Sequence, residues 1–389
     1  MTPDFDPGSI RSLWSLETDM VFLNHGSYGA TPRAVQEEQT RWRALMEQQP
    51  VRFMLDHAPR EIRAAADRLA AFLGAEGQEI GFVENATAGV NAVLGSMDFD
   101  EGDEVIITDH VYNAVRNTLR HRLEPVGACL VTAKIGMPVP SPNEVHDRVM
   151  AALTPATRLI LLDHVASVSA AIFPVAEIAA SAREQGVAVL IDGAHGPGLI
   201  DLNVPTLGVD WYVGNCHKWL CAPKGAGFVW AAAERQVGLH PPVISHALGQ
   251  GFAAEFDMVG TRDASAWLSV PAAIDLHEKL GGAGLRERNR SVALEAAARL
   301  AARWNTGAGA SPEQFGGMVT VRLPDGLAPG RENAERLRRW VWEARRIELV
   351  VSAFAEAHWL RMSVPAYVSA EDCDAAGPAI EAGLEALVP

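Results

Sequence analysis

The chain has 389 residues, 48% of them hydrophobic and 21% charged, and this length exceeds the usual size of a single hydrophobic core. Its formal net charge is −15 and no basic stripe interrupts the acidic background, which excludes nucleic acid and anionic membrane surfaces as favoured partners. No uninterrupted apolar run of about 18 residues occurs, so we expect no membrane-spanning segment.

The amino-terminal part is expected to form an arm over residues 1–20. Residues 1–16 lack a basic stretch followed by an apolar core and a cleavage site, so we expect a cytoplasmic protein. Two helices are predicted next, an amphipathic one around Pro32 to Gln48 and an alanine-rich one around Pro59 to Phe72. The cysteines show no paired short spacing, which indicates reduced thiols and no metal site.

The middle of the chain alternates apolar runs with helix-like stretches. The runs predicted as buried strands are Glu104 to Thr108, Gly127 to Ala133, Leu159 to Leu162, Val187 to Ile191 and Gly227 to Ala231. Helices are predicted between them, at Ser141 to Leu153 and Val175 to Gln185. Near-continuous apolar strands that alternate with helices are typical of a parallel sheet covered on both faces, so we predict a large α/β domain over residues 21–270.

The composition changes after about Pro271, where helices and strands follow in mixed order. The predicted elements are a long helix (Leu285 to Trp304), a strand (Gly317 to Leu323), a helix (Arg331 to Ala344), strands at Glu348 to Val351 and His358 to Val364, and a last helix from Ala370. This order indicates a smaller α+β domain over residues 271–389.

The strongest chemical signal is a strand that ends in Asp192, followed by a second strand-like run that ends in His217-Lys218. The sequence Pro-Lys-Gly-Ala-Gly comes next, at residues 223–227. Ligands of open α/β sheets bind outside the carboxyl ends of the strands, so both side chains are expected to enter one crevice. An isolated lysine is usually a solvated surface residue and an isolated strand-end aspartate a cap or turn. The combination of both residues with the glycine-containing sequence favours a ligand-binding site.

This pattern resembles the class V aminotransferase superfamily of fold type I pyridoxal 5'-phosphate (PLP) enzymes, which implies a mostly parallel sheet of seven strands. By this resemblance Lys218 holds the cofactor as an aldimine and then acts as the base at the α-carbon. Asp192 keeps the ring nitrogen protonated. His195 bonds the ring hydroxyl, and His217 packs beside the lysine. The sequence departs from the family at Asn215, where a serine that touches the phosphate is common.

A second segment, Gly81 to Asn91, joins an apolar run to small and hydroxyl residues that open a helix. The N–H groups and dipole of a helix start favour phosphate. The resemblance assigns the cofactor phosphate to Thr87 and to the amide of Ala88. An ordinary helix cap is the alternative.

The resemblance also implies a residue over the cofactor ring and a contact between subunits. Tyr112, with His110 in reserve, is placed over the face of the pyridine ring, although a core or surface tyrosine is the alternative. Thr261, in Met258 to Asp263, is placed against the phosphate of a partner subunit, which implies a homodimer with shared active sites.

Substrate contacts are predicted at both ends of the chain. Arg361 follows the family's Arg-x-Ser pattern, and its guanidinium fork suits an α-carboxylate. An exposed strand arginine is the alternative. Asn24 and His25 belong to an opening motif, Asn-His-Gly-Ser-Tyr-Gly, that lines the cleft from the other side.

The finer features resemble the isopenicillin N epimerase-like branch. They imply an epimerase or racemase that acts on an amino acid through a quinonoid intermediate. The alternative is a carbon–sulfur β-lyase similar to hercynylcysteine sulfoxide lyase. An aminotransferase fits this branch less well, and a cysteine desulfurase is disfavoured because residues 350–359 contain no cysteine. The alternative from a different functional class is a noncatalytic α/β binding protein.

Overall fold

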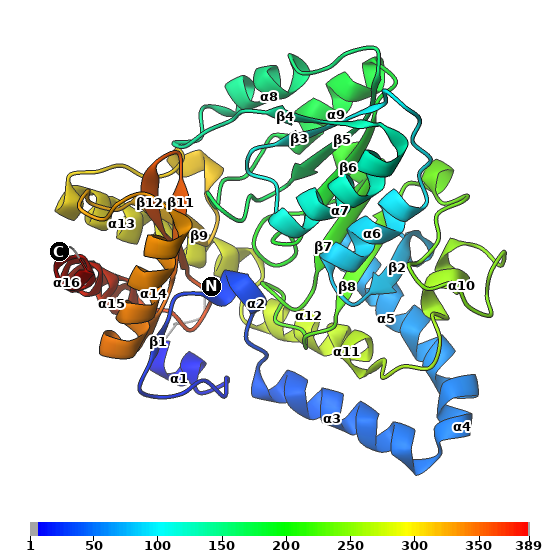
Figure 1. Ribbon diagram of the computed structural model, residues 1–389. Helices are drawn as coiled ribbons and strands as arrows, with labels where there is room; N and C mark the ends of the chain where they lie inside the picture. The colour runs from blue at the N-terminus through cyan, green and yellow to red at the C-terminus, as the bar shows by residue number, and fades with distance from the viewer. Residues whose placement is uncertain (1–6, 388–389) are drawn as a thin grey trace.

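A computed structural model describes residues 7–387, so residues 1–6 of the expected amino-terminal arm and the last two residues lie outside the described part. Figure 1 shows a large α/β part, built around one sheet, beside a smaller part that contains the carboxyl-terminal strands and helices. No helix within residues 7–387 is both long and apolar enough to cross a membrane.

The large part is organised around a seven-stranded sheet with the order β2-β8-β7-β6-β5-β3-β4. Its strands are β2 (Ile80–Val83), β3 (Glu104–Thr108), β4 (Cys129–Ala133), β5 (Thr157–Asp163), β6 (Ala188–Gly193), β7 (Trp211–Asn215) and β8 (Gly227–Ala231). All neighbouring pairs are parallel except the two that involve β8. The predicted fold class, a mostly parallel seven-stranded sheet of the PLP-enzyme type, is therefore confirmed.

The apolar strands are continuous because both faces of the sheet are covered. Along β5, Leu159 and Leu161 pack into a core with helices α6 (Ala86–Gly95) and α7 (Asn113–Leu123). Ile160 and Leu162 pack into the core on the other face, with helices α8 (Pro142–Met150) and α9 (Val175–Glu184). Successive side chains of a strand point to opposite faces, so a strand covered on both sides needs apolar residues at every position.

The helices in and around the large part include the two predicted near the amino terminus. Their bounds are α1 (Pro7–Arg11), α2 (His25–Tyr28), α3 (Arg33–Gln48), α4 (Pro50–Arg52), α5 (Ala58–Leu73), α6 (Ala86–Gly95), α7 (Asn113–Leu123), α8 (Pro142–Met150), α9 (Val175–Glu184), α10 (Phe252–Asp257), α11 (Ser265–Leu268) and α12 (Val270–Lys279). Helix α12 begins at Val270, where the sequence suggested the domain boundary, and the position of that boundary stays a prediction.

The smaller part contains a three-stranded antiparallel sheet with the order β11-β12-β9. Its elements are α13 (Ala283–Trp304), β9 (Met318–Arg322), α14 (Arg331–Arg345), β10 (Ile347–Glu348), β11 (Val350–Phe354), β12 (Ala357–Ser363), α15 (Ala370–Asp374) and α16 (Ala376–Leu387). A short strand at the other end of the chain, β1 (Val21–Phe22), pairs in parallel with β10. The amino-terminal segment is therefore fixed against the carboxyl-terminal part, and residues 24–29 lead from there to the large sheet.

Candidate active site

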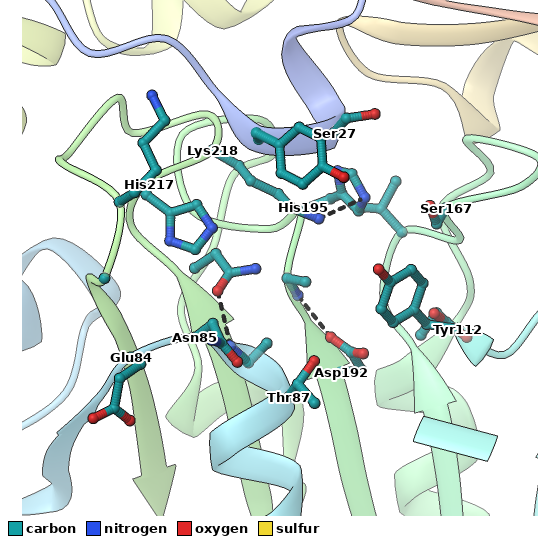
Figure 2. A pocket seen from close by; sticks show the side chains of 18 residues that line it. Ser27, Glu84, Asn85, Thr87, Tyr112, Ser167, Asp192, His195, His217 and Lys218 are labelled. Carbon is teal, nitrogen blue, oxygen red and sulfur yellow. Dashed lines mark hydrogen bonds between the residues drawn. The ribbon is translucent and has the colours of Figure 1, made fainter. Parts of the chain in front are cut away.

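A cavity of about 470 Å³ lies at the carboxyl ends of β5, β6 and β7, beside the starts of α6 and α7. Figure 2 shows Lys218 and His195 on one side of it, with Thr87 and Asp192 across from them and Tyr112 at a third side. The cavity is lined by Ser27, Tyr28, Glu84, Asn85, Ala86, Thr87, Tyr112, Asp163, Val165, Ser167, Asp192, Ala194, His195, Asn215, His217, Lys218, Lys224 and Gly225.

The Lys218 amine is held by a histidine whose protonation the structure defines. His195 Nδ1 accepts a hydrogen bond from the Trp219 indole N–H at 3.2 Å, so the neutral ring carries its proton on Nε2. That Nε2 lies 3.2 Å from Lys218 Nζ, so its N–H can donate to the amine once the lysine has lost its proton. Burial lowers the pKa of Lys218 to about 8, although Asp192 opposes this shift, and burial also holds the pKa of His195 well below its ordinary value.

The predicted substrate contact His25 lies instead behind the lysine. Its Nε2–H donates to the Lys218 carbonyl at 2.9 Å, and its Nδ1 accepts from the Tyr367 hydroxyl at 2.7 Å. His25 is fully buried and does not line the cavity. Gly29 explains the close approach of this segment: its φ is +70°, and a Cβ there would lie 1.9 Å from the His217 carbonyl oxygen.

Asp192 lies at the end of β6, as predicted, and its Oδ1 accepts the Ala194 N–H at 3.0 Å. Burial raises the pKa of Asp192, while the Ala194 N–H and the charge of Lys218 lower it. A second buried carboxyl, Asp163, ends the neighbouring strand β5 and lines the same cavity. The sequence analysis missed Asp163, although it follows an apolar run in the same way as Asp192.

The start of α6 faces the cavity, where a phosphate was expected. Asn85 caps this helix by accepting the Ala88 N–H on its side-chain oxygen at 3.0 Å, so the amide assigned to the phosphate has an internal partner. The Thr87 hydroxyl lines the cavity and has no hydrogen-bond partner among the described residues. Asn215, in place of the expected serine, accepts the Ala86 N–H at 2.8 Å, and this fixes the helix start against the end of β7.

Glycines in the predicted motif allow close contact between the lysine loop and this helix. A Cβ on Gly227 would lie 2.6 Å from the Cα of Asn85, so a side chain there would displace the cap of α6. His217 lines the cavity, as predicted beside the lysine, and its Nδ1–H donates to the Ala226 carbonyl at 3.1 Å. Burial, with a contribution from Lys218, lowers the pKa of His217 to about 4.

The structure places Tyr112 and the alternative residue, His110, in different environments. Tyr112 precedes α7, lines the cavity and is 47% exposed, so its ring is accessible to a ligand. His110 is fully buried outside the cavity, where its Nε2–H donates to the Gly136 carbonyl at 2.9 Å and its ring lies 4.8 Å from that of Phe354. A direct contact of His110 with a ligand in the cavity is not compatible with this position.

Arg361 is 4% exposed, and no carboxylate among the described residues pairs with it. Its Nη1 donates to the Ser167 carbonyl and hydroxyl at 2.6 and 3.0 Å, and its Nη2 to Ser27 Oγ at 3.1 Å. Asn24 accepts from Ser27 and, at 3.4 Å, from Arg361, so it orients the guanidinium and does not itself line the cavity. Ser27 and Ser167, which sequence reasoning missed, connect Arg361 to the cavity wall.

Thr261 is exposed and lies outside this cavity. The next residue, Arg262, stacks on Trp267, with 3.6 Å between its Cζ and the ring centroid, and pairs with Glu84 at 2.8 Å. Since Glu84 lines the cavity, the segment around Thr261 borders it from outside. Contact with a partner subunit stays a prediction.

The donor set fits PLP. The cavity presents an amine suited to an aldehyde, a buried carboxylate suited to a ring nitrogen, and a helix start with an unpartnered hydroxyl suited to a phosphate. The residues that would hold it are Lys218, Asp192, His195, Thr87 and His217, and the side-chain amide of Asn215 faces the same space.

Comparisons with known proteins also indicate a PLP enzyme. The family described as Aminotransferase class-V matches residues 30–339. An isopenicillin N epimerase of Streptomyces clavuligerus is 34% identical over 96% of this chain and 97% of its own length. An L-cysteine desulfhydrase of Arabidopsis thaliana is 30% identical over 86% of this chain and 78% of its own length. The solved structure of an Escherichia coli cysteine desulfurase has a TM-score of 0.80 at 21% identity and covers 99% of this chain and 100% of its own.

Proposed function

The chain belongs to the class V aminotransferase family of PLP enzymes, and on that premise we propose that it is an amino-acid epimerase or racemase. The observation that carries the proposal is the Lys218 amine, held by His195 in the same cavity as Asp192. When bound, PLP supplies an electron-withdrawing ring that stabilises the charge left on an α-carbon when one of its bonds breaks.

The residues of the chain have separate roles in the proposed reaction. Lys218 removes the α-proton as a base, and its depressed pKa supports that role near neutral pH. Asp192 stabilises positive charge on the ring nitrogen. Arg361 binds the α-carboxylate of the substrate, a role supported by a buried guanidinium whose described partners are all uncharged.

Inversion of configuration requires a proton donor on the face opposite Lys218. Tyr112 enters the cavity from the start of α7, a different element from the lysine loop, and its ring is free of described hydrogen bonds. Its hydroxyl is the group we assign to proton return on the second face. The 34% identity to an isopenicillin N epimerase over nearly the whole of both chains favours this reading.

A carbon–sulfur β-lyase is the second candidate, and it is favoured by the relatives named as L-cysteine desulfhydrases. This reaction begins with the same proton removal by Lys218. A sulfur substituent then leaves the β-carbon, and water releases pyruvate and ammonia. A desulfurase is disfavoured because no cysteine lies among the described residues that line the cavity, so no thiol there can accept the sulfur.

The assembly and location belong to the same proposal. We assign a homodimer with shared active sites because the segment around Thr261 is exposed beside the cavity, and Tyr28, which lines it, is 75% exposed. A cytoplasmic location follows from the sequence expectation alone.

The test is to incubate the enzyme with a panel of amino acids in heavy water and to analyse the products. An epimerase yields amino acid of inverted configuration with deuterium on the α-carbon and no keto acid. A lyase yields pyruvate and ammonia from a cysteine-type substrate. A Lys218→Ala control should do neither. If a good substrate is consumed without α-deuterium and without elimination product, proton removal by Lys218 is not the first step.

A further inference from the structure

Two aspartates end neighbouring strands at the floor of the cavity. Asp163 of β5 and Asp192 of β6 are register partners in a parallel pair. Leu161 and Leu190, two positions earlier on each strand, are also partners and both pack into the core with α6 and α7. Side chains two residues apart share a face, so both carboxyls point to the α6–α7 side, about one strand spacing, roughly 5 Å, apart.

The two carboxyls differ in their surroundings. Asp192 accepts the Ala194 N–H and is 5% exposed. Asp163 is 3% exposed, and its Oδ2 has no hydrogen-bond partner among the described residues although it belongs to the cavity wall. An ionised carboxylate that is buried without a partner is costly, whereas a neutral carboxyl can carry a hydrogen on that oxygen and donate it to a ligand.

The charges that face the pair cannot balance two anions. Lys218 is the cation that acts on both carboxyls, and one lysine neutralises one carboxylate. Among the described residues the other groups that act on the pair are uncharged: they are the backbone N–H groups of Asp163, Tyr112 and Ala194, and the buried Tyr212 phenol. Tyr212 packs in the core on the other face of the sheet, where its hydroxyl lies 3.1 Å from His164 Nδ1. Like charges this close in a buried site do not both ionise.

We propose that Asp163 is a proton-bearing residue of this site, neutral at working pH, so that Asp192 is the single anion presented to PLP. The proposal rests on the function proposed above for the cavity. Burial and the neighbouring Asp192 charge place the pKa of Asp163 well above its ordinary value, although the Asp163 and Tyr112 N–H groups and Lys218 oppose this shift. The Ala194 N–H and Lys218 favour ionisation of Asp192. The proton of the pair therefore resides on Asp163, as a hydrogen-bond donor on the cavity wall.

The first test is a pH titration of the visible absorbance of bound PLP in the full-length holoenzyme. It reports the pKa of the Lys218 nitrogen in the bound state. Asp192→Asn removes an anion and should lower that pKa by about one unit or more, since an opposite charge at this range shifts a pKa by one to three units. Asp163→Asn exchanges one neutral group for another and should shift it by less than about 0.3 unit. Similar downward shifts in both variants would overturn the proposal.

The second test needs no variant of the pair. Infrared spectra of holoenzyme with ¹³C-labelled aspartate should contain a labelled, protonated-carboxyl band at pH 7.5. Asp257 does not contribute much there because its pKa is raised only to about 6. Asp163→Asn should remove the band, and Asp201→Asn, a change at a 98% exposed carboxylate, should leave it. Absence of the band from the unmodified enzyme would refute a neutral Asp163. A chain that binds no PLP would instead refute the proposed function, and the band could still be measured.

Discussion

Lys218→Met should stabilise the cofactor-free chain, because the site holds an amine at a position that disfavours its charge. Burial lowers the pKa of Lys218 from 10.5 to about 8. A difference of about 2.5 units at 1.36 kcal/mol per unit corresponds to about 3 kcal/mol at neutral pH. Lys218 lines the cavity, and the effective dielectric of such sites exceeds that of a dry interior, so we expect about 2 kcal/mol to be measured.

The pH dependence of this gain has a definite sign. Between about pH 8 and pH 10.5 the unfolded chain binds the Lys218 proton and the folded chain does not, so the native enzyme gains stability as pH rises through that window. Lys218→Met lacks this contribution. Its advantage should be complete below pH 8 and should disappear as the pH approaches 10.5.

The assay is urea denaturation of both proteins, stripped of cofactor, at pH 7 and pH 10, with the shift of the midpoint as the readout. The matched control is Lys134→Met, because Lys134 is exposed, and this variant should show no gain at pH 7 that fades at pH 10. Two results would contradict the assigned environment of the amine: a Lys218→Met chain that is less stable than the native one at pH 7, or one that gains the same stability over the native chain at pH 7 and at pH 10.

Two further variants test the surroundings of the lysine. Arg361→Ala should raise the apparent dissociation constant of the substrate roughly 30-fold or more, since loss of a buried charged partner costs about 2 to 5 kcal/mol. The control is Arg322→Ala, a change at an exposed arginine. Unchanged substrate affinity in Arg361→Ala would place the carboxylate site elsewhere. His25→Ala should lower kcat more than it raises KM and lower the urea midpoint, because it leaves the buried Lys218 carbonyl and a buried phenol unpaired, at about 1 to 3 kcal/mol each. The exposed His121→Ala should change neither, and a KM effect alone in His25→Ala would restore the direct substrate contact first expected.

The sheet was predictable from sequence where burial on both faces leaves a continuous apolar run. Strands β3 and β8 have the predicted bounds, and β5 and β6 differ from prediction by one or two residues at each end. The position of β8 between β2 and β7, antiparallel to both, was not predictable, because strand pairing depends on contacts between segments far apart in the chain. The start of helix α12 at Val270 was likewise not predicted.

The site was predictable where a motif ends a strand, as at Asp192 and Lys218. Asp163 carried the same signal, an acidic residue directly after an apolar run, and could have been found. Ser27 and Ser167 belong to segments without a periodic pattern, so nothing in the sequence indicated that they would meet Arg361. The positions of His110 and of the Ala88 amide depend on single hydrogen bonds, to Gly136 and Asn85, that spacing does not reveal.

The two sides of the cavity differ in how firmly their groups are held, and this difference bears on the reaction. On the lysine side three hydrogen-bond contacts fix the catalytic group: His25 bonds the Lys218 carbonyl, His195 contacts its amine, and Trp219 donates to His195. On the opposite side Tyr112 is half exposed and its hydroxyl has no described hydrogen-bond partner. A rigid lysine suits the α-proton removal that epimerases and β-lyases share, since small displacements of a base are costly. In the proposed function the fate of the substrate after that step depends on the Tyr112 side: we expect a hydroxyl positioned there to return the proton, and its displacement to favour departure of a β-substituent.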